Sequence, residues 1–197
     1  MKAIFRTTAI LLCLALTVLL FSGCSAGIHH AEIVFENYGT VTLELDGKTA
    51  PKTVRNFIKL AKSGFYDGLT LHRIADLGTG YIVQGGDPNG DGTGGSGESV
   101  KGEFAANGHR NSISHRRGVI SMARGSGFEG EMDSASSQFF ICVGDVTALN
   151  GLYAAFGHVT EGMEVLDEIV ADAVEKGING IVPMEDRVVI TAIRIID

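Results

Sequence analysis

Cysteine is scarce in this chain of 197 residues, and tryptophan is absent. Of the three cysteines, Cys13 and Cys24 fall in the N-terminal segment, which leaves Cys142 alone in the apolar run 139–143. A cysteine among apolar residues usually packs as a small core residue, and a thiol without a partner forms no intrachain disulfide. The sequence therefore excludes a small disulfide-bonded domain.

An excess of basic residues is also missing. Sixteen Lys and Arg stand against 23 Asp and Glu, which gives a formal net charge of −7. This balance argues against a nucleic-acid partner and against electrostatic adhesion to anionic lipid. The histidines lack the spacing of a zinc protease, and no serine stands in a G-x-S-x-G elbow. We therefore expect no hydrolytic chemistry and no cofactor.

Long apolar runs are limited to one stretch near the N-terminus. Lys2 and Arg6 precede an uncharged run from Ala9 to Phe21, which Ser-Gly-Cys24 follows. The run is too short to span a bilayer, and its basic start is typical of a signal peptide. The Phe-Ser-Gly-Cys order resembles a bacterial lipobox, in which the thiol of Cys24 is acylated, by palmitate for example, and the signal is cut before it.

An ordinary secretory signal cleaved near Ala26 is the alternative. We predict a lipoprotein signal peptide at 1–23, a tether at 24–30 and one domain at 31–197. The expected location is outside the cytoplasm, with the protein anchored by lipid to the bacterial cell membrane. The remaining chain is long enough for one hydrophobic core. It contains no internal repeat and no sign of oligomerisation, so a monomer is expected.

Short alternating segments and two amphipathic segments set the predicted fold. Alternation at 31–36 and 40–45 around Asn37-Tyr38-Gly39 predicts a β-hairpin. Helices are predicted at 51–62, with Pro51 in the first turn, and at about 163–175. Further strands are predicted at 81–86, 118–122, 138–143, 153–160 and 188–195. Many short strands, two helices and abundant glycine predict a mainly β fold, an antiparallel sheet closed on itself.

Two polar side chains stand inside short apolar strand-like runs. Arg73 follows Leu71-His72 and precedes Ile74, and Gln138 precedes Phe139-Phe140-Ile141. A guanidinium is costly to bury, so an arginine in this setting is expected to line a groove wall. From this pattern alone, a structural arginine paired with a carboxylate is equally well supported.

Five ordered motifs, spread over 31–197, resemble those of the cyclophilin-type peptidyl-prolyl isomerases. The family carries F-H-R-x-I, Q-G-G-D and S-Q-F-F-I, and this chain has Leu71-His72-Arg73-Ile74, Gln84-Gly85-Gly86-Asp87 and 136–141 in the same order. The segments 118–123 and 156–159 match as well. The resemblance implies a closed eight-stranded antiparallel barrel capped by two α-helices. It also implies rotation of the peptide bond before proline in exported polypeptides, and a binding module without turnover on the same scaffold is the alternative.

The resemblance also assigns roles to individual residues. Arg73 matches the catalytic arginine. The substrate-binding positions of the family correspond here to Tyr81, Ile82, Gln84, Ala123, Arg124, Gln138, Phe140, Leu149 and Tyr153. Ala148 stands where eukaryotic members have the tryptophan that binds cyclosporin, so drug affinity is expected to be weak. The connection 75–80 is longer than the usual proline-glycine link.

One further pattern competes for a function. Asp87, Asn89, Asp91 and Glu98 fit the fixed positions of an EF-hand calcium loop. That module needs a helix on both sides, whereas 81–86 is predicted to be a strand. We therefore expect no metal centre and keep calcium, bound as a structural ligand of this loop, as a secondary hypothesis.

Overall fold

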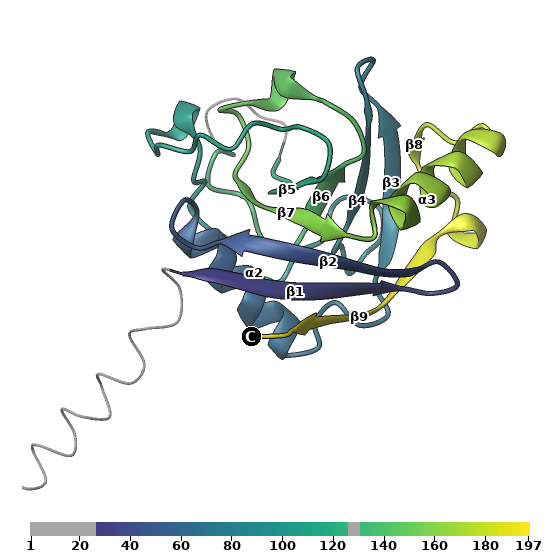
Figure 1. The fold of residues 1–197 in the computed structure, drawn as a ribbon, viewed down its shortest axis with the longest axis horizontal. Helices are drawn as coiled ribbons and strands as arrows, with labels where there is room; N and C mark the ends of the chain where they lie inside the picture. Colours follow the sequence, from purple (N-terminus) through teal and green to yellow (C-terminus); the bar gives the residue numbers. More distant parts are fainter. Residues whose placement is uncertain (1–26, 126–130) are drawn as a thin grey trace, which may run out of the picture.

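A computed structural model describes residues 27–125 and 131–197, and these form an antiparallel barrel (Figure 1). The sheet order is β4-β6-β5-β7-β2-β1-β9-β3, and β4 also pairs with β3, which closes it. A two-residue strand, β8, pairs with β3 at Arg73 and Ile74. The strands are β1 Ile28–Phe35, β2 Gly39–Asp46, β3 Thr70–Asp76, β4 Tyr81–Gly85, β5 Val119–Met122, β6 Phe139–Cys142, β7 Ala155–Glu161, β8 Gly180–Ile181 and β9 Val188–Ile195. The predicted eight-stranded closed barrel is confirmed.

The first hairpin forms where the alternation predicted it. Asn37 adopts a left-handed φ of 65°, which asparagine tolerates, and Tyr38 N donates to Phe35 O at 3.3 Å. The strand β1 begins at Ile28, so 28–30 of the predicted tether belong to the barrel. These residues extend the hairpin, since Ile28, His29 and His30 pair with Asp46, Leu45 and Glu44 of β2. The far end of the chain adds a contact, because His30 N donates to Asp197 Oδ1 at 2.6 Å.

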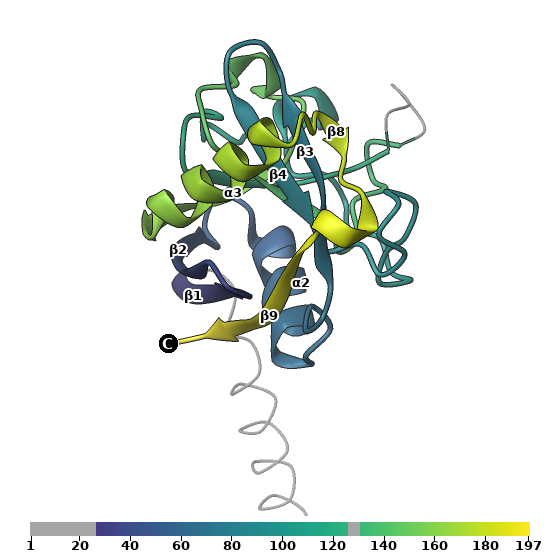
Figure 2. The same cartoon turned by 90° about the vertical axis from the view of Figure 1, so that its right-hand side faces the viewer.

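Two helices cover the ends of the barrel, and both match their predicted bounds (Figures 1 and 2). They are α2 Pro51–Lys62 and α3 Met163–Glu175. The first turn of α2 has no side-chain cap from its own N-cap residue. Instead, the buried carboxylate of Glu103 accepts hydrogen bonds from Lys52 N at 3.0 Å and from Thr53 N at 2.9 Å. A carboxylate in this position satisfies two free N–H groups and interacts favourably with the helix dipole.

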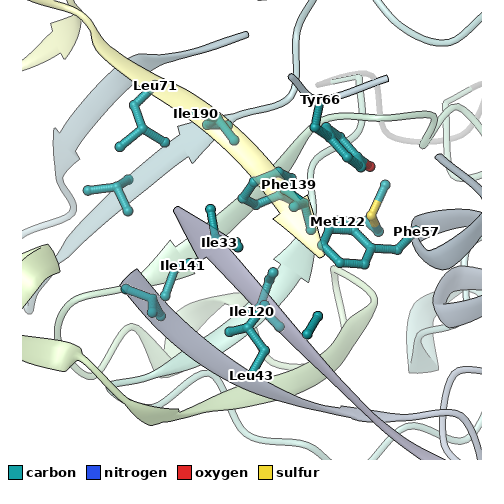
Figure 3. Close-up of a cluster of buried hydrophobic side chains, with 14 of the residues drawn as sticks. Ile33, Leu43, Phe57, Tyr66, Leu71, Ile120, Met122, Phe139, Ile141 and Ile190 are labelled. Carbon is teal, nitrogen blue, oxygen red and sulfur yellow. The ribbon is translucent and has the colours of Figure 1, made fainter. Parts of the chain in front are cut away.

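The barrel interior is filled by aromatic and branched side chains (Figure 3). The ring centroids of Phe57 and Phe139 lie 5.7 Å apart, nearly perpendicular, and Tyr66 packs edge-on to Phe139 at the same separation. Such edge-to-face pairs add to the free energy gained by burying apolar area. A second, smaller apolar cluster lies on the outer face of the sheet: Ala75, Ile82, Val119, Phe140, Cys142, Val146 and Ala155.

The position of Cys142 agrees with its predicted core role, since its side chain is fully buried in this outer cluster. Burial raises the pKa of its thiol to about 12, which makes it unreactive at neutral pH. Among the described residues, no helix is both long and apolar enough to cross a membrane. The predicted signal peptide and Cys24 lie outside the described residues.

Candidate functional site

Strand register brings the polar residues of two distant motifs into one row on the outside of the barrel. Arg73 on β3 pairs with Gln84 on β4, Gln84 pairs with Phe140 on β6, and Phe140 pairs with Ser121 on β5. Residues directly opposite one another in antiparallel strands lie on the same face. Four strands therefore carry a guanidinium, an amide, an aromatic ring and a hydroxyl side by side on the outer face.

A chain of hydrogen bonds fixes the polar end of this row. Arg73 Nη1 donates to Gln84 Oε1 at 3.0 Å, and Gln84 Nε2 donates to Gln138 Oε1 at 2.9 Å. Gln138 Nε2 then donates to the carbonyls of Gly92 at 3.0 Å and Gly94 at 2.8 Å. The glycine-rich loop thus orients both amides, and Gln84 presents its oxygen to the guanidinium.

The guanidinium of Arg73 is held by a neutral amide and not by a carboxylate. Within 27–125 and 131–197, no ion pair includes Arg73, although its side chain is half-buried. The structure therefore disagrees with the alternative of a structural arginine neutralised by an acid. A guanidinium has five N–H donors, so a single bond to Gln84 leaves most of them for a ligand.

Next to Arg73 lies a mainly apolar pocket of about 320 Å³. Its floor is Phe140, whose ring is perpendicular to that of Tyr153 at a centroid distance of 5.7 Å. A small apolar pocket bordered by a few fixed polar groups is typical of a ligand site. The lining residues are Arg73, Leu77, Ile82, Gln84, Ala123, Arg124, Phe140, Leu149 and Tyr153.

Eight of the ten residues that the sequence assigned to the site line this pocket, and two lie elsewhere. Tyr81 packs against the interior core, since successive residues in a strand point to opposite faces and Ile82 faces out. Gln138 lines a second pocket of about 260 Å³ beside the first. The pockets share Gln84, Ala123 and Arg124, so they form one continuous groove. Ala148 is exposed in the 3-10 turn Thr147–Leu149.

Arg124 forms part of the rim between the two pockets. Its guanidinium carbon lies 4.8 Å from the ring centroid of Tyr153 and 5.4 Å from that of Phe104. Its Nε donates to Leu152 O at 3.1 Å. These contacts hold the guanidinium against the rings of Tyr153 and Phe104 at the edge of the groove.

A buried histidine beneath the pocket was not singled out from the sequence. His115 stacks on Phe140 with ring centroids 5.9 Å apart, and its Nε2 lies 3.0 Å from Ser121 Oγ. Asn150 Oδ1 accepts from His115 N at 2.7 Å. Burial lowers the pKa of His115 below its ordinary value of 6.5, although the hydrogen bond with Asn150 opposes this. Its local sequence, Ser-His-Arg-Arg, looks like an exposed basic loop.

The calcium-like loop uses its carboxylates for other contacts. Asp87 accepts hydrogen bonds from Asn89 N at 2.9 Å and from Gly92 N at 2.6 Å. Asp91 accepts from Thr93 N at 2.9 Å, and Glu98 pairs with Lys59 at 2.7 Å. Within the described residues, no group of three or more acidic, His or Cys side chains has the geometry to hold a metal. The loop follows strand β4 and serves to hold Gln138.

A closed barrel with an outward groove, a fixed guanidinium and a mainly apolar pocket is typical of a protein that binds extended peptides. Residues 30–195 match the family model described as cyclophilin type peptidyl-prolyl cis-trans isomerase/CLD. The chain belongs to this family, as the sequence motifs predicted.

Individual relatives agree with the family assignment. A peptidyl-prolyl cis-trans isomerase of Helicobacter pylori (strain ATCC 700392 / 26695) is 45% identical over 135 residues, which is 68% of this chain and 76% of the relative. Peptidyl-prolyl cis-trans isomerase B of Bacillus subtilis (strain 168) is 43% identical over 131 residues, 66% of this chain and 83% of the relative.

Solved structures agree with the fold. A Cryptosporidium parvum cyclophilin type isomerase has a TM-score of 0.71 at 32% identity, covering 86% of this chain and 98% of its own. A second crystal structure of that isomerase, determined in the presence of the dipeptide Ala-Pro, has a TM-score of 0.70.

Proposed function

We propose that the groove binds proline-containing segments of exported polypeptides and that Arg73 accelerates rotation of the bond before proline. The observation that carries this proposal is the half-buried guanidinium of Arg73, held at the pocket edge by Gln84 alone among the described residues. Peptide resonance opposes rotation by roughly 18–20 kcal/mol. When the bond twists, the lone pair localises on the prolyl nitrogen, and an N–H donor stabilises it in that form.

The positions of the apolar pocket and of Arg73 support separate roles, with the pocket binding proline and Arg73 acting on the bond before it. Arg73 and Phe140 line the same pocket, so a prolyl ring bound over Phe140 lies within the reach of the guanidinium. Gln84 holds the guanidinium without neutralising it, so the charge-assisted hydrogen bond to substrate keeps its strength. No covalent intermediate and no proton transfer is needed, since arginine keeps its charge at every physiological pH.

The test is cis/trans exchange in a proline peptide, measured by NMR exchange spectroscopy on the protein and on Arg73→Ala. We expect the substitution to lower kcat/KM by roughly 10²- to 10³-fold, with a much smaller change in peptide affinity. Arg194→Ala, on the exposed face of β9, is the matched control and should keep full activity. Peptide binding without faster exchange in the unsubstituted protein would instead make it a binding module on a cyclophilin barrel.

We further propose that Cys24 carries acyl chains that anchor the protein on the outer side of the bacterial cell membrane. Support comes from the sequence alone, through the basic start, the apolar run and the Ser-Gly-Cys24 order. Lipoproteins carry more than one chain because a single acyl chain binds membranes only marginally. Metabolic labelling with a palmitate analogue should mark the protein but not Cys24→Ser. Equal labelling of both would contradict acylation at this cysteine.

We also propose that the protein acts as a monomer, and the support is the sequence, which contains no pattern typical of oligomerisation. Sedimentation velocity checks this proposal, and a concentration-dependent dimer would contradict it.

A further inference from the structure

Two large apolar side chains are exposed near Arg73, Leu77 in the turn after β3 and Ile181 across β3 from Gln84. Leu77 is 39% exposed and lines the apolar pocket together with Arg73. Ile181 is 55% exposed and is the direct partner of Arg73 in the pairing of β3 with β8. Partners in an antiparallel pair lie on one face, so Ile181 borders the guanidinium from β8 as Gln84 does from β4.

The backbone around Leu77 is fixed by several contacts. Leu77 N donates to Gly80 O at 3.0 Å, and Gly78 N donates to Asp76 Oδ1 at 2.7 Å. Asp76 N donates in turn to Asn179 Oδ1 at 2.9 Å, which joins this turn to the segment leading into β8. The strand β8 lies beside β3, the strand that leads into this turn (Figure 1).

A close approach of two backbones locks the other side of this turn. A Cβ atom added at Gly80 would lie 2.7 Å from Gly144 Cα, so only glycine allows these segments to touch. The turn is therefore held from β8 and from the loop after β6. Leu77 is therefore held in a fixed position at the edge of the apolar pocket.

We propose that Leu77 and Ile181 form an apolar shelf that selects peptides with an apolar side chain next to the proline. This inference rests on the proposed function. A proline in the pocket has two flanks, and one of them follows the polar second pocket, lined by Gly92, Thr93, Gly94, Ser134, Ser136 and others. The other flank leaves the pocket at Leu77 and continues past Arg73 to Ile181, where an apolar side chain loses contact with water.

The test compares two series of short peptides, one varying the residue before proline and one the residue after it. Each series carries leucine or serine at the varied position, and NMR exchange gives kcat/KM with the full-length protein. In one series, we expect leucine to exceed serine by roughly five- to tenfold. The double variant Leu77→Ser, Ile181→Thr should reduce this ratio to about twofold or less, and the rate of the serine peptides records any general loss caused by the change at Leu77 in the pocket wall.

Two matched variants separate the shelf from a general disturbance. Met184→Ser removes another apolar side chain, 78% exposed in the 3-10 turn Met184–Asp186, and should leave the ratio unchanged. Leu77→Met keeps an apolar group on the same turn and should retain the preference. Equal rates for leucine and serine in both series, or a ratio unaffected by the double variant, would overturn the shelf. Absence of exchange with any peptide would overturn the proposed function itself.

Discussion

Arg73 has its charge available because its neighbour is an amide. Gln84 accepts one N–H of the guanidinium and donates to Gln138, so it orients Arg73 without cancelling its charge. A carboxylate at this position would pair with Arg73 and compete with the substrate for its donors. The amide at position 84 therefore orients Arg73 and leaves its charge available to the substrate.

Replacement of Gln84 separates orientation from binding. In Gln84→Ala, the guanidinium loses its only described hydrogen-bond partner, so we expect kcat to fall roughly tenfold with KM changed less than threefold. In Gln84→Glu, the new ion pair should lower kcat at least as much. NMR exchange spectroscopy on both variants, at several peptide concentrations, measures kcat and KM. Full activity in Gln84→Glu would show that the neutrality of position 84 has no role.

The buried histidine makes stability depend on pH. Burial lowers the pKa of His115 in the folded state, so below its ordinary value of 6.5 the unfolded chain binds a proton that the folded chain does not. Stability is therefore complete above pH 6.5 and is lost as the pH falls from there toward the folded-state pKa, by at most about 1.4 kcal/mol per pH unit for one histidine.

Urea unfolding of His115→Gln between pH 5 and 8 checks this dependence. The variant should show a flatter profile than the unsubstituted protein below pH 6.5. His158→Gln, at an exposed position of β7, is the control and should keep the original slope. Some dependence of stability on pH should remain in His115→Gln, because burial also lowers the pKa of His72.

At the scale of elements, α2 depends on a residue that lies outside it. Glu103 is 2% exposed, and its carboxylate also accepts from Thr53 Oγ1 at 2.8 Å. Glu103→Ala leaves the N–H groups of Lys52 and Thr53 without their acceptor in a buried place, and we expect a loss of about 2–4 kcal/mol in unfolding free energy.

Thermal and urea unfolding measure this loss, with Glu98→Ala as the matched control. Glu98 is exposed and pairs with Lys59 on the surface, so its removal should leave the midpoint unchanged. A Glu103→Ala midpoint equal to that of Glu98→Ala would show that water replaces the carboxylate at the start of α2.

The elements with clear local signals could be predicted from the sequence, and those defined by distant partners could not. The bounds of α2 and α3 agree because amphipathic periodicity and Pro51 are local signals. The strand β8 was missed, since two residues carry no pattern and its existence depends on pairing with β3. Within the site, motif order predicted Arg73 and Phe140, whereas Leu77 comes from a turn that the motifs do not include.

The whole barrel depends on β9, which joins β1 to β3. Ile190 on β9 is fully buried and pairs with Phe35 on β1. Ile190→Ala should cost about 2–5 kcal/mol, and because the sheet is closed we expect the loss to reach every strand. Amide hydrogen exchange should show reduced protection in β5 and β6 as well as in β1 and β9. Loss confined to β1 and β9 would mean that the barrel opens in parts.

The first strand, β1, pairs with the last one, β9, and this limits when the barrel can form during synthesis. A chain that leaves the ribosome at roughly 5–20 residues per second exposes β1 many seconds before its partner β9 exists. Until β7 is made, β1 and β2 pair only with each other, and an isolated hairpin is at best marginally stable in water; until β9 is made, β1 still lacks its second partner strand. The barrel therefore cannot close until β9 has left the ribosome, even though every other strand of the barrel has been made by then.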